Sequence, residues 1–234
     1  MRVGVIQSSF IPWRGYFDFI ASVDVFVFHD DLQYTKGDWR NRNKIKTVKG
    51  TEWITVPVCH QSTSQLICET QICNQQAWAK KHLRLWHNHY KNTAYLNDVL
   101  DILSILESND NLTISQLNIK LIQRISNYLG IDTPMILSND LSLQGSKTDR
   151  LIDLLTKLNA DTYLSGPSAD AYLDKEAFRK NGISLEYKAY NYAPYPQQWG
   201  FFEGAVTVLD LIANCGFESK NYIQSLNANT VVIA

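Results

Sequence analysis

The sequence predicts an α/β fold: a mainly parallel sheet flanked by helices, of the kind that binds nucleotides, with a helical insertion. Two short apolar runs, Arg2–Gln7 and Val23–His29, are joined by a loop and a helical segment, which is the opening of a βαβ unit. Further strand-like runs alternate with helical patterns later in the chain. Between residues 75 and 130, helix follows helix. We therefore expect residues 1–234 to form a single α/β domain that carries a helical insertion at 75–130.

The first elements are short and apolar. Arg2–Gln7 is a β-branched run followed by turn-forming residues, and Val23–His29 is apolar without alternation, as expected for parallel strands buried on both faces. Tyr16–Ser22 lies between them and is predicted to be a short helix. Trp53–Cys59 is strand-like, although Pro57 places it at a sheet edge or a strand end.

The clearest helix is Ile114–Leu129, whose apolar side chains fall on one face. Thr113 and Gln116 form a capping box before it, and Gly130 stands where a helix ends. Other segments with helical patterns are Ala77–Tyr90, Ala94–Leu106, Thr148–Leu158 and Gly204–Asn214. Later strands are predicted at Pro134–Ser138, Thr162–Ser165 and Ile183–Tyr190.

Composition excludes several classes of protein. Apolar residues make up 45% of the chain and charged residues 19%, which excludes disorder, collagen and coiled coil. The 22 basic and 23 acidic residues give a net charge of −1, so affinity for nucleic acid or phosphate has to come from a local patch. No apolar run approaches the roughly 18 residues of a membrane span, and the N-terminus lacks a secretory signal. We expect a cytoplasmic protein.

The four cysteines, Cys59, Cys68, Cys73 and Cys215, are irregularly spaced. Their spacing matches neither a disulfide framework nor a common zinc site. We therefore expect reduced thiols packed as small apolar side chains, and no structural metal.

The first candidate binding segment runs from Gln7 to Tyr16. A strand that passes through a Pro/Gly loop into a helix places backbone N–H groups where an anion can bind, and Gly15 permits close approach to the backbone. The segment has too few glycines for a P-loop or a dinucleotide fingerprint. The alternative is a tight turn in which Trp13 and Tyr16 are packing anchors.

The second candidate is the basic segment Tyr34–Gly50. It holds six cationic residues and one carboxylate, a net charge of +5, so the rest of the chain sums to −6. Arginine and asparagine supply directional donors, and aromatic rings offer stacking faces for a base or a sugar. The alternative is a charged hairpin between two strands. The candidate substrate- and phosphate-binding residues of this segment are Lys36, Trp39, Asn41, Arg42, Asn43 and Lys46.

Carboxylates follow two of the predicted strands. Asp30 and Asp31 come directly after Val23–His29, and ligands of open α/β sheets bind at this end of the strands. One of them could hold Mg²⁺, orient a sugar hydroxyl or act as a general base; the alternative is a turn leaving the strand.

A late strand leads into the fourth candidate segment. Ser165, Gly166 and Asp170 follow Thr162–Ser165, and we expect them at the same end of the sheet as Asp30, where they complete a pocket. A weaker companion is Gly145–Thr148, which opens a helix and could cradle a phosphate, although it reads first as an N-cap pattern.

At these residues the sequence resembles the WbqC-like family. The resemblance rests on three blocks near the N-terminus, on a later block and on the C-terminal region, and therefore covers nearly the whole chain. One departure is Ser8, where the family usually has proline. The blocks are Gln7–Phe17, Asp30–Lys36, Trp39–Val58, Tyr163–Asp174 and Tyr195–Gly216.

The resemblance implies a setting more than a mechanism. Such proteins are typically encoded with genes for bacterial O-antigen and other surface polysaccharides, which implies a role in making or modifying an activated sugar. The leading hypothesis is an enzyme that acts on a nucleotide-linked (amino) sugar by group transfer, with Arg42 and Lys46 on the diphosphate. The alternatives are a nucleic-acid or tRNA-binding module and a non-catalytic assembly partner. All three leave the oligomeric state open.

The leading hypothesis depends on one spatial expectation. The basic loop at Arg42 has to fold over the sheet edge that presents Asp30 and Gly166, so that the three places share one cleft.

Overall fold

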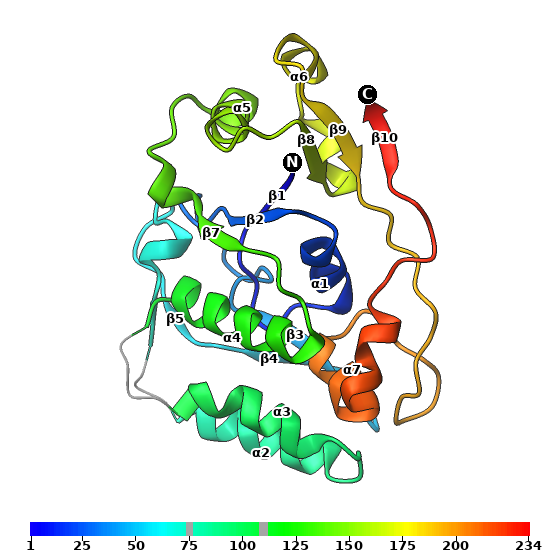
Figure 1. Cartoon of the computed structure of the whole chain (residues 1–234). Coiled ribbons are helices and arrows are strands. Elements are labelled where there is room, and N and C mark those ends of the chain that lie inside the picture. Colours follow the sequence, from blue (N-terminus) through cyan, green and yellow to red (C-terminus); the bar gives the residue numbers. More distant parts are fainter. Residues whose placement is uncertain (74–76, 108–111) are drawn as a thin grey trace.

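The computed structural model describes residues 1–73, 77–107 and 112–234. Its centre is a six-stranded sheet in the order β10-β9-β8-β1-β2-β7, in which all neighbours are parallel except β10, which runs antiparallel to β9 (Figure 1). The prediction of an α/β fold with a mainly parallel sheet is confirmed. The strands are β1 (Arg2–Ile6), β2 (Val25–Phe28), β7 (Met135–Leu137), β8 (Thr162–Ser165), β9 (Ser184–Tyr187) and β10 (Thr230–Ile233).

The order of the parallel strands creates a switch point between β1 and β8. From β1 the chain moves outward to β2 and then β7, and it returns to the other side of β1 as β8 before continuing to β9. Connections on the two sides of the switch point therefore leave in opposite directions, which opens a crevice at the carboxyl ends of β1 and β8.

Helices cover both faces of the sheet. On one face, Val3 and Val5 of β1 pack with α5 (Lys147–Lys157) and α6 (Lys175–Lys180), which lie at the top of Figure 1. On the other face, α1 (Arg14–Ala21) packs against β2 in a larger core. Four further helices contribute to that core: α2 (Trp78–Tyr90), α3 (Leu96–Leu103), α4 (Ile114–Leu129) and α7 (Val208–Cys215).

The stretch predicted as an insertion holds α2, α3 and α4 between β6 (Gln71–Ile72) and β7. Its expected first residue, Gln75, lies outside the described residues, as do residues 108–111. The bounds of α4 agree with the sequence prediction, because its ends are fixed locally. Thr113 accepts a hydrogen bond from the backbone N–H of Gln116, and Gly130 closes the helix in the left-handed region at φ 71°.

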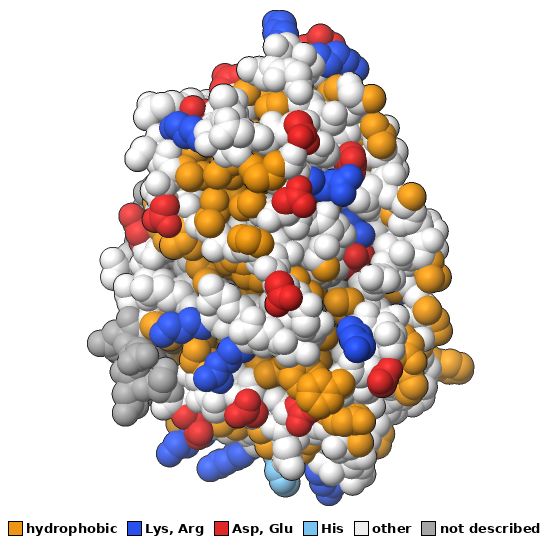
Figure 2. Space-filling model, in the orientation of Figure 1, with side chains coloured by type: hydrophobic (Ala, Val, Ile, Leu, Met, Phe, Trp, Pro, Cys, Tyr) orange, Lys and Arg blue, Asp and Glu red, His pale blue; other side chains and the backbone are white. Residues whose placement is uncertain are grey.

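The basic segment forms the first strand of a hairpin, β3 (Arg42–Thr47) with β4 (Gly50–Thr55), which is the alternative raised for it from the sequence. The sequence predicts a strand only from Trp53 onward. On the face shown in Figure 2, acidic and basic side chains are interspersed. No helix among residues 1–73, 77–107 and 112–234 combines the length and the apolar character that a membrane crossing needs.

The expectation of reduced thiols is wrong for one pair. Cys59 and Cys73 form a disulfide with a Cα–Cα distance of 5.5 Å, whereas Cys68 and Cys215 are free. The antiparallel pairing of β5 (Val58–Cys59) with β6 (Gln71–Ile72) brings the two cysteines together. This contact between distant positions cannot be deduced from cysteine spacing. In the same region, η1 (Ile67–Glu69) packs against α4.

Candidate functional site

A cavity of about 720 Å³ lies at the switch point and is here called the switch-point cavity. The carboxyl ends of β1 and β8 form its floor, the first turn of α5 forms one wall, and the loop after β8 forms another. This is the place where open α/β sheets bind their ligands. Its polar lining residues are Gln7, His29, Lys147, Thr148, Arg150, Ser165 and Ser168, together with the Gly166 backbone.

The start of α5 presents positive charge to this cavity. Lys147 is exposed and occupies the first position of the helix, and Ser146 before it makes no side-chain cap hydrogen bond. The first backbone N–H groups of α5 are therefore not capped by that side chain, and a helix N-terminus in this state favours an anion. The N-cap pattern noted in the sequence is thus not used as a cap.

Arg150 and Asp31 form an ion pair at the edge of the cavity. Asp31 also accepts a hydrogen bond from the Ser138 hydroxyl at 2.5 Å, and His29 Nε2 lies 3.6 Å from its Oδ1. Burial acts to raise the pKa of Asp31, but the hydrogen bonds from Ser138 and Arg150 and the charge of Arg150 act against it, and that pKa is lowered. Burial lowers the pKa of His29, so its imidazole is neutral at pH 7.

Asp30 follows the same strand but points into the protein. Its side chain is 2% exposed and accepts hydrogen bonds from the Ser8 backbone N–H at 2.7 Å and from the Ser115 hydroxyl at 2.5 Å. It thereby ties the loop after β1 to α4, and it does not line the switch-point cavity.

Of the three residues predicted in the loop after β8, two line the switch-point cavity and one does not. Ser165 and Gly166 line the switch-point cavity. Asp170 lies outside it, with an ion pair to Lys175 at 2.6 Å and a hydrogen bond from the Tyr187 hydroxyl at 3.0 Å. The Lys175 and Tyr187 hydrogen bonds lower the pKa of Asp170.

A second cavity of about 470 Å³, here called the aromatic cavity, lies on the α1 side of β1. The loop from β1 to α1, the approach to β3 and the segment after β9 form its walls. Ile6 lines both cavities, and the Arg40 Nη1 donates a hydrogen bond to the Gln7 Oε1 between them at 2.9 Å. The aromatic cavity is lined by Ile6, Ser9, Pro12, Trp13, Tyr16, Trp39, Arg40, Asn43, Tyr190, Gly204 and Ala205.

Gly15 allows the Trp13 ring to lie against the first turn of α1. A Cβ at position 15 would fall 2.4 Å from the Trp13 ring, closer than nonbonded atoms approach. Trp13 in turn packs against Tyr190 with ring centroids 5.3 Å apart, and both residues line the aromatic cavity. The predicted residue Gly15 thus acts through Trp13.

We expect Gly15→Ala to lower the free energy of unfolding by about 1–3 kcal/mol, because the added methyl group displaces the Trp13 ring. Urea unfolding followed by tryptophan fluorescence measures this loss. Gly166→Ala is the matched control, since nothing lies within 4 Å of its Cβ position and its φ is −76°. Equal stability of the two variants would contradict the placement of Trp13.

The remaining predicted residues of the basic segment line neither cavity. Arg42 lies over the Trp53 ring at 4.2 Å, and Lys36 is exposed. Lys46 is 4% exposed, and its Nζ donates to Gln197 Oε1 at 2.8 Å and to the Phe201 carbonyl at 2.5 Å. Asn41 is buried and donates to the Val56 carbonyl.

The structure thus brings seven of the predicted residues to two cavities at one sheet edge, whereas Arg42 and Asp30 line neither. Gln7, Ser165 and Gly166 line the switch-point cavity. Trp13, Tyr16, Trp39 and Asn43 line the aromatic cavity. Sequence reasoning missed His29, Arg40, Lys147, Arg150 and Tyr190 as lining residues. Of these, Arg40 belonged to the basic segment Tyr34–Gly50 and Lys147 to Gly145–Thr148.

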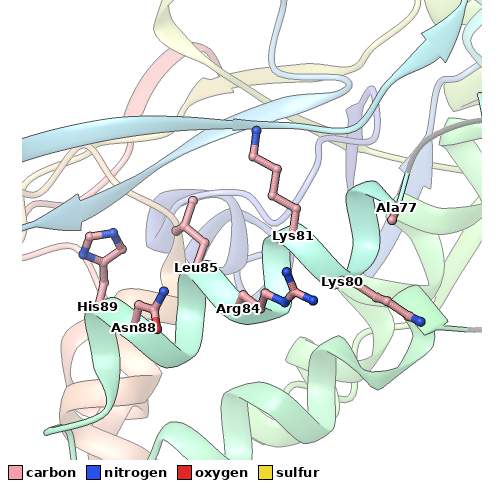
Figure 3. Close-up of a pocket in the computed structure, with 7 residues that line it drawn as sticks. All are labelled: Ala77, Lys80, Lys81, Arg84, Leu85, Asn88 and His89. Atoms are coloured by element: carbon pink, nitrogen blue, oxygen red, sulfur yellow. The ribbon is translucent and has the colours of Figure 1, made fainter.

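A further hollow of about 310 Å³ lies on α2 and contains none of the predicted residues (Figure 3). Lys81, Leu85 and His89 project from α2 toward the neighbouring strands. Next to it, His82 is buried and its Nε2 lies 3.1 Å from the Thr55 carbonyl oxygen. Within the described ranges, no three His, Cys, Asp or Glu side chains come together as a metal site.

Comparison with known proteins places the chain in a family. The model of the WbqC-like protein family matches residues 7–222, which is most of the chain. The chain belongs to the WbqC-like family. The matched region contains all the residues that line the two cavities except Val5 and Ile6 of β1. The family resemblance drawn from the sequence is therefore confirmed.

This WbqC-like protein is also similar to the uncharacterized protein Rv1507c of Mycobacterium tuberculosis. The two are 44% identical over 226 residues, which cover 95% of this chain and 97% of that protein. No solved structure was found to match the chain.

Proposed function

We propose that this WbqC-like protein is an enzyme of surface-polysaccharide biosynthesis that binds a nucleotide-linked sugar in the switch-point cavity and transfers a group to it. The observation that carries the proposal is the position of this cavity, which opens at the carboxyl ends of β1 and β8 and meets the uncapped start of α5. Nucleotides bind in such crevices because the helix N-terminus stabilises their phosphates.

The diphosphate of the ligand is assigned to Lys147 and the first backbone N–H groups of α5. Lys147 is exposed and has no carboxylate partner among the described residues, so its charge is available. Gly166 faces open space where a side chain would be, which leaves room for the ligand to approach the backbone. Gln7 and Ser165 supply groups that hydrogen-bond sugar hydroxyls.

His29 is the proposed general base. It lines the cavity and is neutral at pH 7, so it can accept the proton of a sugar hydroxyl or amine that attacks the donor of the transferred group. Asp31 lies 3.6 Å from its Nε2 and stabilises the imidazolium that forms. In this proposal Asp31 positions His29 and Arg150, and Asp30 and Asp170 make no contact with the substrate.

We expect Lys147→Ala to weaken the binding of nucleotide-linked sugars by about tenfold or more, because it removes a charge-assisted contact to the diphosphate. Calorimetric titration with UDP-, GDP-, CMP- and dTDP-sugars, with and without Mg²⁺, measures the affinity; tRNA is included as the competing ligand class. Lys180→Ala on α6 is the control, because Lys180 lies outside the cavity.

Two results would contradict the proposal. One is that no nucleotide-linked sugar binds the wild-type protein. The other is that Lys147→Ala and Lys180→Ala bind such a sugar equally well. Binding of tRNA with a steep salt dependence, and of no sugar, would favour the nucleic-acid alternative instead.

A further inference from the structure

The aromatic cavity is not explained by the proposed binding of a nucleotide-linked sugar. It lies on the face of β1 that packs against α1, whereas the switch-point cavity lies on the face that packs against α5. Ile6 lines both cavities. The hydrogen bond between Gln7 and Arg40 joins a residue of the switch-point cavity to a residue of the aromatic cavity. Two hollows on opposite sides of one strand end can hold two different ligands.

Arg40 is a buried cation whose hydrogen-bonding capacity is not filled. The residue is 8% exposed, its Nη1 donates to Gln7, and its Nε has no hydrogen-bond partner among the residues that the structure describes. The carboxylate of Asp38 lies 3.8 Å from Nε, beyond hydrogen-bond distance. A guanidinium withdrawn from water is unfavourable unless anionic or polar partners bind it. Arg40 also lines the aromatic cavity, so its positive charge favours an anion there.

Two other polar side chains on the wall, Asn43 and Tyr16, are already engaged in hydrogen bonds. The Asn43 side chain donates to the Phe10 and Ile11 carbonyls and accepts from the Lys44 backbone N–H. The Tyr16 hydroxyl donates to the Gln7 carbonyl. Among the lining residues are four aromatic side chains and one cation, Arg40.

Four aromatic residues shape the space around Arg40. Trp13, Tyr16, Trp39 and Tyr190 line the cavity, and its volume of about 470 Å³ admits a ring of one or two fused cycles. Aromatic side chains bind flat rings by stacking, and a guanidinium binds a phosphate or carboxylate through paired N–H groups. Together these groups select a flat ring that carries an anionic substituent.

We propose that the aromatic cavity is a second ligand site that takes a flat-ringed anion, with the ring among Trp13, Trp39 and Tyr190 and the anionic group on Arg40. Such an anion is either a mononucleotide or an aromatic carboxylate. This binding site does not depend on the proposed function.

The test is titration of the whole protein with two probes, AMP as ring plus phosphate and indole-3-acetate as ring plus carboxylate, followed by calorimetry. The expected result is that at least one probe binds, and that adenosine and orthophosphate each bind at least about tenfold more weakly than AMP, or indole at least about tenfold more weakly than indole-3-acetate. Which probe binds distinguishes the nucleotide source from the carboxylate source.

Variants locate the bound probe. Arg40→Lys and Trp39→Ala should each weaken its binding at least about tenfold. Arg42→Lys is the control: it makes the same arginine-to-lysine substitution two residues later, outside the cavity, and should leave probe binding unchanged. Trp39 is 43% exposed, so Trp39→Ala keeps the test decisive if Arg40→Lys fails to fold.

Lys147→Ala separates this proposal from the proposed function. Unchanged probe binding in Lys147→Ala supports the second site, even if no nucleotide-linked sugar binds the protein. The proposal is overturned if neither probe binds, if Arg40→Lys and Trp39→Ala bind the probe like the wild type, or if Lys147→Ala abolishes probe binding, which would place the probe in the switch-point cavity.

Discussion

Asp30→Ala should lower the free energy of unfolding by about 3 kcal/mol. The substitution removes a buried carboxylate and leaves the Ser8 N–H and the Ser115 hydroxyl without their partner. Each buried donor left unpaired costs about 1–3 kcal/mol. Urea unfolding at pH 7, followed by circular dichroism, measures the change.

The control is Asp170→Ala, because Asp170 is exposed and its ion pair with Lys175 lies at the surface. We expect that variant to unfold close to the wild type. An Asp30→Ala protein that keeps wild-type stability but loses transfer to the sugar would mean that Asp30 acts in the reaction and not in the fold.

His82 should make the protein less stable as the pH falls from 7 to 4. Burial lowers its pKa from 6.5 to about 4, because the charged imidazole is poorly solvated where α2 packs against β4. The unfolded chain takes up the proton near pH 6.5 and the folded protein only near pH 4, so protonation favours unfolding across this window. A shift of this size corresponds to roughly 3 kcal/mol, present above pH 6.5 and lost by pH 4.

The His82→Gln variant isolates this contribution. Carboxylates also titrate between pH 4 and pH 7, but they do so in both proteins and cancel in the comparison. The stability of the wild type relative to the variant, taken from urea unfolding at several pH values, should fall by roughly 3 kcal/mol between pH 7 and pH 4. A constant difference between the two proteins would show that His82 is solvated in the native state.

Elements with local signals could be predicted from the sequence. The capping box and Gly130 fix the ends of α4, and the strand predicted at Thr162–Ser165 is β8. β3 was missed because half of its residues are cationic, and it is held by its antiparallel pairing with β4. Tertiary pairing overrides local preference there. β10 was missed although its residues, Thr230–Ile233, are all β-branched and have the composition of a strand.

The candidate site could be predicted only as far as general rules reach. The rule that ligands bind at the carboxyl ends of parallel strands led to Gln7, Asp31 and Gly166, all of which lie at or beside the switch-point cavity. It could not distinguish Asp31 from Asp30, since adjacent side chains point in different directions and only the packing of α4 shows which one is buried.

The basic segment shows why charge alone does not locate a site. Along β3, side chains alternate between two faces, so Arg42 and Lys44 share the face of Trp53 while Asn43 faces the core. Lys147 lies 105 positions after Arg42 in the sequence, and only the return of the chain to β8 brings it to the sheet edge.

A crystal structure of the protein with the nucleotide-linked sugar that binds most tightly tests the central claim most directly. The account predicts the diphosphate between the carboxyl ends of β1 and β8, in contact with the Lys147 Nζ and the first N–H groups of α5. A ligand bound instead along the β3–β4 hairpin, with its phosphates on Arg42 and Lys44, would contradict it.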